Sequence, residues 1–228
     1  MNRPLAIACL SCLISLVAFA EEKADLKKGT PIDLTEYVNH TPGEKIEADS
    51  REGNTLPLPL GEQTFEGIRM KVEEKVVQLG STVMKERPEK VSGIKIGRKL
   101  ARLHILHATC FGGGPNRPGA AWYVEEDTAI GEYRINYDDG SSENILIEYG
   151  KDVRDWWFRE DEKETSRSKV VWKGANDLAE KYDCLLRLYL TTWKNPKPDQ
   201  KVVSVDYVGR KDETVAAPFC VAMTIEEK

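Results

Sequence analysis

The densest cluster of side chains that could bind a ligand lies between residues 149 and 159, where the sequence reads Tyr-Gly-Lys-Asp-Val-Arg-Asp-Trp-Trp-Phe-Arg. Neighbouring residues at the end of a strand cannot all point into one core, so we expect one of Trp156 and Trp157 to pack inward and the other to lie at the surface. An exposed indole stacks on the apolar face of a sugar ring, while a carboxylate such as Asp155 accepts hydrogen bonds from the sugar hydroxyls. The alternative is that both tryptophans close one end of the core.

A second candidate for binding is the glycine-rich segment 111–119, which reads Phe-Gly-Gly-Gly-Pro-Asn-Arg-Pro-Gly. No Gly-Lys-Ser/Thr follows it and no helix is indicated after it, so it lacks the cation and the helix dipole of a phosphate-binding loop. The segment is predicted to be a long loop between strands, with Trp122 directly beyond it. Because such loops often carry binding residues, Asn116, Arg117 and Trp122 join the candidate ligand contacts.

The residue types that serve catalysis or metal binding are present, but their spacing does not favour either role. His104 and His107 are three residues apart, and an odd spacing on a strand sends two side chains to opposite faces. His104 and Cys110 share a face, yet six residues at about 3.3 Å each separate them by about 20 Å, too far for a nucleophile and its base. The acidic turn at 138–141 lacks the spaced carboxylates of an EF-hand. The sequence therefore nominates no catalytic residue, and we predict a protein that is not an enzyme.

Residues 1–20 have the pattern of a secretory signal peptide. They contain one cation, Arg3, an apolar run from Leu5 to Phe19, and small residues at Ala18 and Ala20 that fit a cleavage site. The apolar run is shorter than the roughly 20 residues of a membrane-spanning helix. We predict a signal peptide at 1–20, a flexible leader at 21–30 and a secreted or periplasmic location. A buried N-terminal helix is the alternative.

Signal cleavage changes the cysteine count from five to three, namely Cys110, Cys184 and Cys220. An odd number spread over 110 residues is not a disulfide framework, and no C-x-x-C spacing is left for zinc. At most one disulfide can form. No second apolar run approaches membrane length, so we expect no transmembrane segment after cleavage.

Length and charge exclude further classes of function. The chain has 228 residues, 33 Lys plus Arg against 38 Asp plus Glu, and a net charge of −5 that becomes −6 when Arg3 is removed. An acidic chain has no general attraction for phosphates, so nucleic acid is not an expected partner. The length fits one sizeable core and excludes a large multidomain enzyme.

The segment 132–149 predicts a β-hairpin. Tyr133, Ile135 and Tyr137 alternate with polar residues, and a second run at 144–149 is rich in Ile and Leu. Asp139-Gly140 between the two runs supplies the left-handed backbone that a tight turn requires.

Similar short runs recur along the chain with turn residues between them. They predict strands at 67–72, 76–79, 100–109, 170–172, 184–193, 202–208 and 219–225, while 175–182 is the single short helix expected. Many short strands with few helical signals are typical of a sandwich or barrel. We therefore predict an all-β protein whose residues 31–228 form one antiparallel β-sandwich domain.

With these segments placed, the chain resembles the galactose-binding-like jelly-roll modules of secreted bacterial proteins. The resemblance is carried by residues 32–39, 93–107, 149–157, 191–196 and 217–219. It implies an eight-stranded β-sandwich of the carbohydrate-binding-module kind, with ligands met by loops at one end and often a structural calcium. It carries over neither a catalytic apparatus nor a defined set of ligand contacts, because a shared fold indicates fold more than function.

The leading hypothesis from the sequence is a secreted, non-catalytic carbohydrate-binding module that recognises a glycan through its end loops. A structural or protein-interaction module of the cell envelope is the alternative, followed by a jelly-roll hydrolase or lyase acting on polysaccharide. The residues predicted to contact the ligand are Trp156, Trp157, Asp155, Trp122, Asn116 and Arg117.

Overall fold

The structure is a computed structural model that describes residues 29–41, 53–113 and 121–228. The predicted signal peptide and most of the predicted leader lie outside the described residues, as do Asn116 and Arg117. No helix in the described ranges is long and apolar enough to cross a membrane.

The described chain forms three antiparallel sheets, none of which closes into a barrel. The largest has the order β1-β13-β6-β11-β10, with β4 added to β13 and β9 added to β11. Its strands are β1 (Thr30–Pro31), β13 (Ala217–Glu226), β6 (Arg102–Cys110), β11 (Leu185–Lys194), β10 (Ser168–Gly174), β4 (Val77–Gln78) and β9 (Trp157–Phe158). The second sheet has the order β5 (Lys90–Lys99), β12 (Lys201–Gly209), β7 (Ala129–Tyr137) and β8 (Ser142–Glu148). The third sheet is the ribbon β2 (Gly61–Phe65) and β3 (Ile68–Val72).

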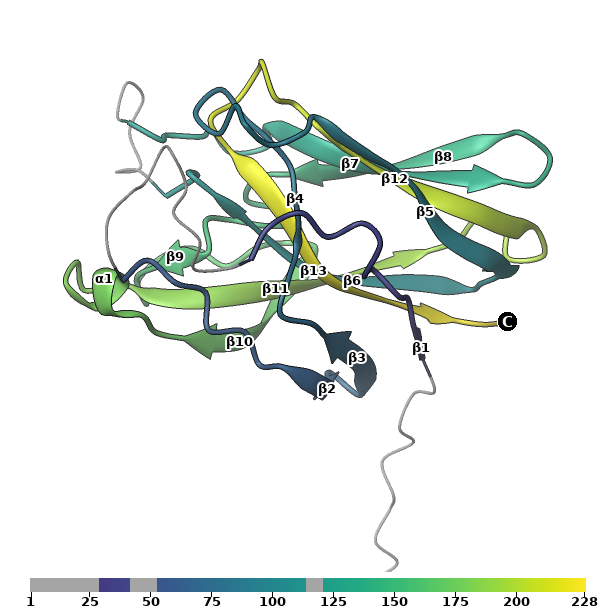
Figure 1. The fold of residues 1–228 in the computed structure, drawn as a ribbon, viewed down its shortest axis with the longest axis horizontal. Helices are drawn as coiled ribbons and strands as arrows, with labels where there is room; N and C mark the ends of the chain where they lie inside the picture. The colour runs from purple at the N-terminus through teal and green to yellow at the C-terminus, as the bar shows by residue number, and fades with distance from the viewer. Residues whose placement is uncertain (1–28, 42–52, 114–120) are drawn as a thin grey trace, which may run out of the picture.

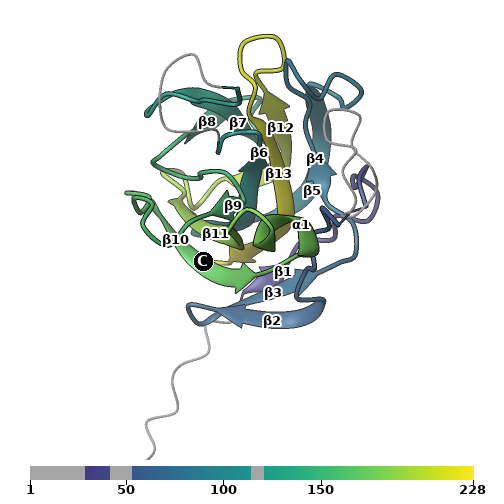
Figure 2. The ribbon, with the colours of Figure 1, turned by 90° about the vertical axis from the view of Figure 1, so that its left-hand side faces the viewer.

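The two larger sheets form the layers of a β-sandwich. In Figure 1, β5, β7, β8 and β12 lie above β10 and β11, and the turned view in Figure 2 shows the same two layers. Their inner faces meet in one buried core, in which the rings of Tyr133 and Tyr207 stack at 4.5 Å with 9° between their planes. The prediction of a single antiparallel all-β sandwich is confirmed.

The central strand β6 is buried on both faces, with eight of its nine residues buried. Its neighbour β13 is buried at nine of its ten residues, and the small ribbon covers part of it, because β3 alternates buried Ile68, Met70 and Val72 with exposed residues and contacts β13. The hydroxyl of Thr224 on β13 donates a 2.7 Å hydrogen bond to the carbonyl of Arg69 on β3. The large sheet is therefore covered by the second sheet on one side and by the ribbon on the other.

Most of the predicted elements are present. The hairpin is formed by β7 and β8, with Tyr133, Ile135 and Tyr137 all buried. The other predicted strands correspond to β3, β4, β6, β10, β11, β12 and β13, and the helix α1 spans Asp177–Glu180. The Asn176 side chain caps this helix by accepting a hydrogen bond from the backbone N–H of Ala179.

The sequence patterns did not identify β5 as a strand, although it has ten residues. Gly93 and Gly97 have positive φ angles of 74° and 68°, and the pairing of β5 with β12 shifts register twice. Such irregularities change which side chains face inward, so the alternation that would indicate a strand is interrupted. In the sequence, this segment is indicated only by the family resemblance.

Candidate functional site

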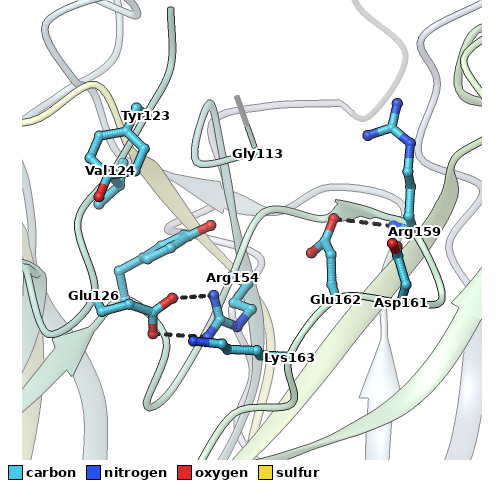
Figure 3. Close-up of a pocket in the computed structure, with 10 residues that line it drawn as sticks. Gly113, Tyr123, Val124, Glu126, Arg154, Arg159, Asp161, Glu162 and Lys163 are labelled. Atoms are coloured by element: carbon cyan, nitrogen blue, oxygen red, sulfur yellow. Dashed lines mark hydrogen bonds and ion pairs between the residues drawn. The ribbon is translucent and has the colours of Figure 1, made fainter. Parts of the chain in front are cut away.

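Three loops at one end of the sandwich enclose a pocket of about 450 Å³. They connect β6 to β7, β8 to β9, and β9 to β10, and Figure 3 shows the side chains that line the pocket. The lining residues are Gly113, Tyr123, Val124, Glu126, Tyr149, Arg154, Arg159, Asp161, Glu162 and Lys163. The lining therefore combines two tyrosine rings with three cations and three anions.

The segment that follows β8 is built into the end of the large sheet, and this fixes the pocket wall. The backbone N–H of Trp156 donates to the carbonyl of Thr109 at the end of β6, at 2.9 Å. The carbonyl of Trp156 in turn accepts a 2.8 Å hydrogen bond from the N–H of Arg187 on β11. The loop is thus held between two strands of the sheet.

Arg154 is a buried cation in this wall. Its side chain is only 4% exposed, and its two terminal nitrogens donate to the two carboxylate oxygens of Glu126 at 2.6 and 2.9 Å. The guanidinium lies 5.5 Å from the centre of the Tyr149 ring, whose hydroxyl donates to the carbonyl of Gly112 at 2.6 Å. A bidentate pair with a stacked ring holds this part of the pocket in one geometry.

Gly150 makes the close approach of Glu126 possible. Its φ angle is 81°, and a Cβ atom at this position would overlap the carboxylate of Glu126. Glycine is therefore required here for two separate reasons, the left-handed backbone and the missing side chain.

Arg187 is a second buried cation, beneath the pocket. Its guanidinium lies 4.8 Å from the centre of the Phe158 ring and 5.3 Å from that of Tyr189. It donates to the carbonyl of Asp155 at 2.9 Å and to one oxygen of Glu162 at 2.6 Å. The other oxygen of Glu162 accepts from the backbone N–H of Arg159 at 3.1 Å, so both oxygens of this pocket carboxylate are engaged.

Asp155 lies behind the pocket lining and organises the backbone there. One carboxylate oxygen accepts from the N–H groups of Gly112 and Gly113 at 2.6 and 2.9 Å, and the other accepts from the N–H of Trp157 at 2.8 Å. Burial raises the pKa of Asp155 to about 6, against the opposing effect of these hydrogen bonds. The sequence prediction treated Asp155 as a ligand contact, whereas its oxygens are occupied by backbone donors of two loops.

The two tryptophans differ in burial. Trp156 is 6% exposed and belongs to the core, so it is the ring that packs inward. Trp157 is half-buried, its ring lies 6.1 Å from that of Tyr182, and its indole N–H donates to the side chain of Asn54 at 3.2 Å. Neither ring lines the pocket.

The structure also places Trp122 beside the pocket instead of in its lining. Trp122 is half-buried, with a φ angle of 62°, and its ring lies 5.7 Å from that of Phe111. The next residue, Tyr123, does line the pocket. Of the six predicted contacts, the four that are described surround the pocket without forming its lining.

Most of the lining residues were not predicted from the sequence. A signal was present in the charged run 159–164, which follows the two tryptophans and Phe158. The missed residues are Tyr123, Glu126, Arg154, Arg159, Asp161, Glu162 and Lys163.

The candidate metal and thiol groups lie elsewhere. His107 accepts or donates hydrogen bonds with Thr191 and Tyr133 at 2.8 and 3.2 Å, and His104 bonds to Thr192 at 2.8 Å. Across the described ranges, no group of three or more His, Cys, Asp or Glu residues could hold a metal ion. Cys110, Cys184 and Cys220 are buried free thiols.

Fold and site together define a β-sandwich protein with a polar, tyrosine-bearing pocket between its end loops. Comparison of the sequence with protein-family models and with curated proteins finds no match.

Proposed function

We propose that this protein is a non-catalytic carbohydrate-binding module of the galactose-binding-like kind, whose glycan ligand occupies the end-loop pocket. The observation that carries the proposal is the composition of that pocket, which has tyrosine rings beside several charged hydrogen-bonding groups. A sugar presents apolar ring faces and many hydroxyls, and such a mixture of aromatic surface and oriented polar groups suits both.

The pocket is also organised before any ligand binds. Arg154 and Arg187 are both 4% exposed and hold Glu126 and Glu162 through short ion pairs. Side chains that are fixed in the free protein lose little conformational entropy on binding, which favours affinity. Tyr123 and Arg159, which are more exposed, are the residues that we expect to touch the ligand directly.

The commitment of two of the three pocket carboxylates favours binding over hydrolysis. A glycosidase requires one carboxylic acid that can release its proton and a second carboxylate that attacks or activates water. Glu126 and Glu162 each engage both oxygens with arginine side chains or a backbone N–H. Both carboxylates therefore serve as hydrogen-bond acceptors within the pocket wall.

The second candidate function is a structural or protein-interaction module of the cell envelope. It is favoured by the positions of Trp156, in the core, and Trp157, against Asn54 and Tyr182. Export, predicted from residues 1–20, remains a prediction under both functions.

The test is retention of the purified protein on a panel of insoluble and gel-embedded polysaccharides, with and without calcium. Tyr123→Ala and Arg159→Ala are expected to weaken retention at least about tenfold. Arg98→Ala is the matched control, because Arg98 is an exposed arginine that pairs with Glu227 outside the pocket. Absence of retention on every polysaccharide would overturn the proposal, as would equal loss in the Arg98→Ala control.

A further inference from the structure

The pocket has more uncommitted hydrogen-bond donors than acceptors. Arg159 donates one side-chain hydrogen bond, from Nη2 to the carbonyl of Tyr182 at 3.1 Å, and its other guanidinium N–H groups make no bond within the described chain. Lys163 has no ion-pair partner among the same residues. Both side chains belong to exposed residues, so a ligand can reach them.

The acceptors of the pocket are largely used. Glu126 binds Arg154 through both oxygens, and Glu162 binds Arg187 and the Arg159 backbone. Asp161 is the one lining carboxylate without an ion pair in the described part of the chain. The lining itself carries three cations and three anions, and behind it Arg187 and the buried carboxylate of Asp155 add one charge of each sign.

Two buried polar atoms beneath the pocket strengthen this imbalance. Nε of Arg154 and the hydroxyl of Tyr189 have no hydrogen-bond partner within residues 29–41, 53–113 and 121–228, although Tyr189 is only 1% exposed. Burial raises the pKa of Tyr189, and its hydroxyl also interacts electrostatically with Arg187, Glu162 and Arg154. A buried donor without an acceptor is unfavourable, and of these two residues Arg154 is the one that lines the pocket.

Accepting the proposed carbohydrate function, we infer that the glycan bound by this pocket is acidic and carries carboxylates, as in a chain of uronic acids. Arg159 and Lys163 are the cations that receive its carboxylates, since guanidinium groups bind carboxylates with charge-assisted hydrogen bonds. The whole chain has a net charge of −5, so general attraction between a basic protein and a polyanion does not explain such binding.

The experiment compares uronic acid polymers with neutral forms of the same backbone. Polygalacturonate, alginate and hyaluronate are each presented beside their carboxyl-reduced counterparts, and dissociation constants are measured by calorimetry at low and moderate salt. At least one of these three acidic polymers is expected to bind at least about tenfold more tightly than its own carboxyl-reduced form. Dextran sulfate, a polyanion without carboxylates, is expected to bind more weakly than the acidic polymer that binds most tightly.

Variants locate the binding to the pocket. The double variant Arg159→Ala/Lys163→Ala is expected to abolish the preference for the acidic polymer. The control Lys95→Ala/Arg98→Ala removes the same charge from exposed ion pairs on β5 and is expected to bind like the unaltered protein. Melting temperatures of both variants verify that each is folded.

Different binding results would contradict the acidic ligand and the carbohydrate-binding function. Equal binding of the acidic and reduced polymers overturns the acidic ligand and leaves a carbohydrate-binding pocket. Stronger binding of dextran sulfate, or loss of binding in the Lys95→Ala/Arg98→Ala control, also overturns it, because the interaction is then with charge in general. Absence of binding to every acidic and neutral polymer overturns both.

Discussion

The carboxylate of Asp155 accepts a 2.6 Å hydrogen bond from the backbone N–H of Gly112, 43 residues earlier in the chain. The same carboxylate holds Gly113 and Trp157, so one buried side chain joins the loop after β6 to the start of β9. Burial of this carboxylate away from water raises its pKa to about 6. The residue therefore has a structural role whose strength depends on pH.

Replacing Asp155 with Asn is expected to lower the free energy of unfolding, with a cost that increases on acidification. The amide keeps one acceptor oxygen but turns an NH₂ group toward backbone donors, which costs about 1–3 kcal/mol. Because the pKa is raised from 3.8 to about 6, the native protein binds more protons than the unfolded chain between these values and gains stability as the pH falls. From pH 7 to pH 5 the deficit of the variant should grow by on the order of 1 kcal/mol, as measured by urea unfolding. An unchanged deficit would contradict this assignment.

His107 should produce the opposite pH dependence. It is fully buried between Thr191 and Tyr133, and burial lowers its pKa from 6.5 to about 3. The unfolded chain therefore binds more protons below pH 6.5, and stability is lost as the pH falls toward 3. At pH 4 this loss is on the order of 3 kcal/mol for the unaltered protein. His107→Gln should be less stable at pH 7 and have a shallower dependence between pH 6.5 and 4; equal slopes in the two proteins would refute the prediction.

Much of the fold could be predicted from the sequence, because a half-buried strand shows itself within its own residues. Alternation made the β7–β8 hairpin visible, and turn residues bounded most other strands. β5 is the exception, since Gly93 and Gly97 interrupt its alternation. The correct class of fold emerged because local preferences and the buried faces agree along most of the chain.

The pocket was harder to predict because its partners are distant in sequence. Arg154 binds Glu126 28 residues earlier, and Arg187 binds Glu162 25 residues earlier. A sequence shows that such charges exist but not which ones meet. The aromatic residues at 156 and 157 attracted attention by their type, yet Trp156 belongs to the core.

Trp156→Ala and Trp157→Ala should differ in their free energies of unfolding, and both should bind polysaccharide as the unaltered protein does. Removing the buried Trp156 ring leaves a cavity and should cost about 3–5 kcal/mol, whereas the half-buried Trp157 should cost less. Trp156→Phe, which retains an aromatic ring, is the milder companion variant. Chemical unfolding gives the stabilities, and retention on polysaccharide below the melting transition should be unaltered in all three. Selective loss of retention in a folded Trp157→Ala protein would instead return that ring to the ligand contacts.

Gly150 and Gly140 provide a matched pair. Both have positive φ angles, 81° and 83°, but a Cβ at Gly140 meets nothing within 4 Å while one at Gly150 overlaps Glu126. Gly140→Ala should cost roughly 1–2 kcal/mol from backbone strain alone. Gly150→Ala should cost more and should also weaken ligand binding, because Glu126 must leave Arg154. Thermal unfolding and retention on polysaccharide test both statements, and equal costs for the two substitutions would argue against the close approach.

The Arg187–Glu162 pair should behave as a unit. Glu162→Gln leaves the guanidinium of Arg187 buried without its counter-ion, and Arg187→Met leaves Glu162 without its strongest donor. Each single change should cost about 3–5 kcal/mol, whereas the double variant should recover part of that loss, since two neutral side chains carry no unpaired charge. A double-mutant cycle from urea unfolding measures the coupling, with Arg98 and Glu227, an exposed pair expected to couple by less than about 1 kcal/mol, as the control. Additive costs at the buried pair would mean that the two residues act independently, and the pocket wall would then owe its geometry to the backbone hydrogen bonds of Asp155 instead.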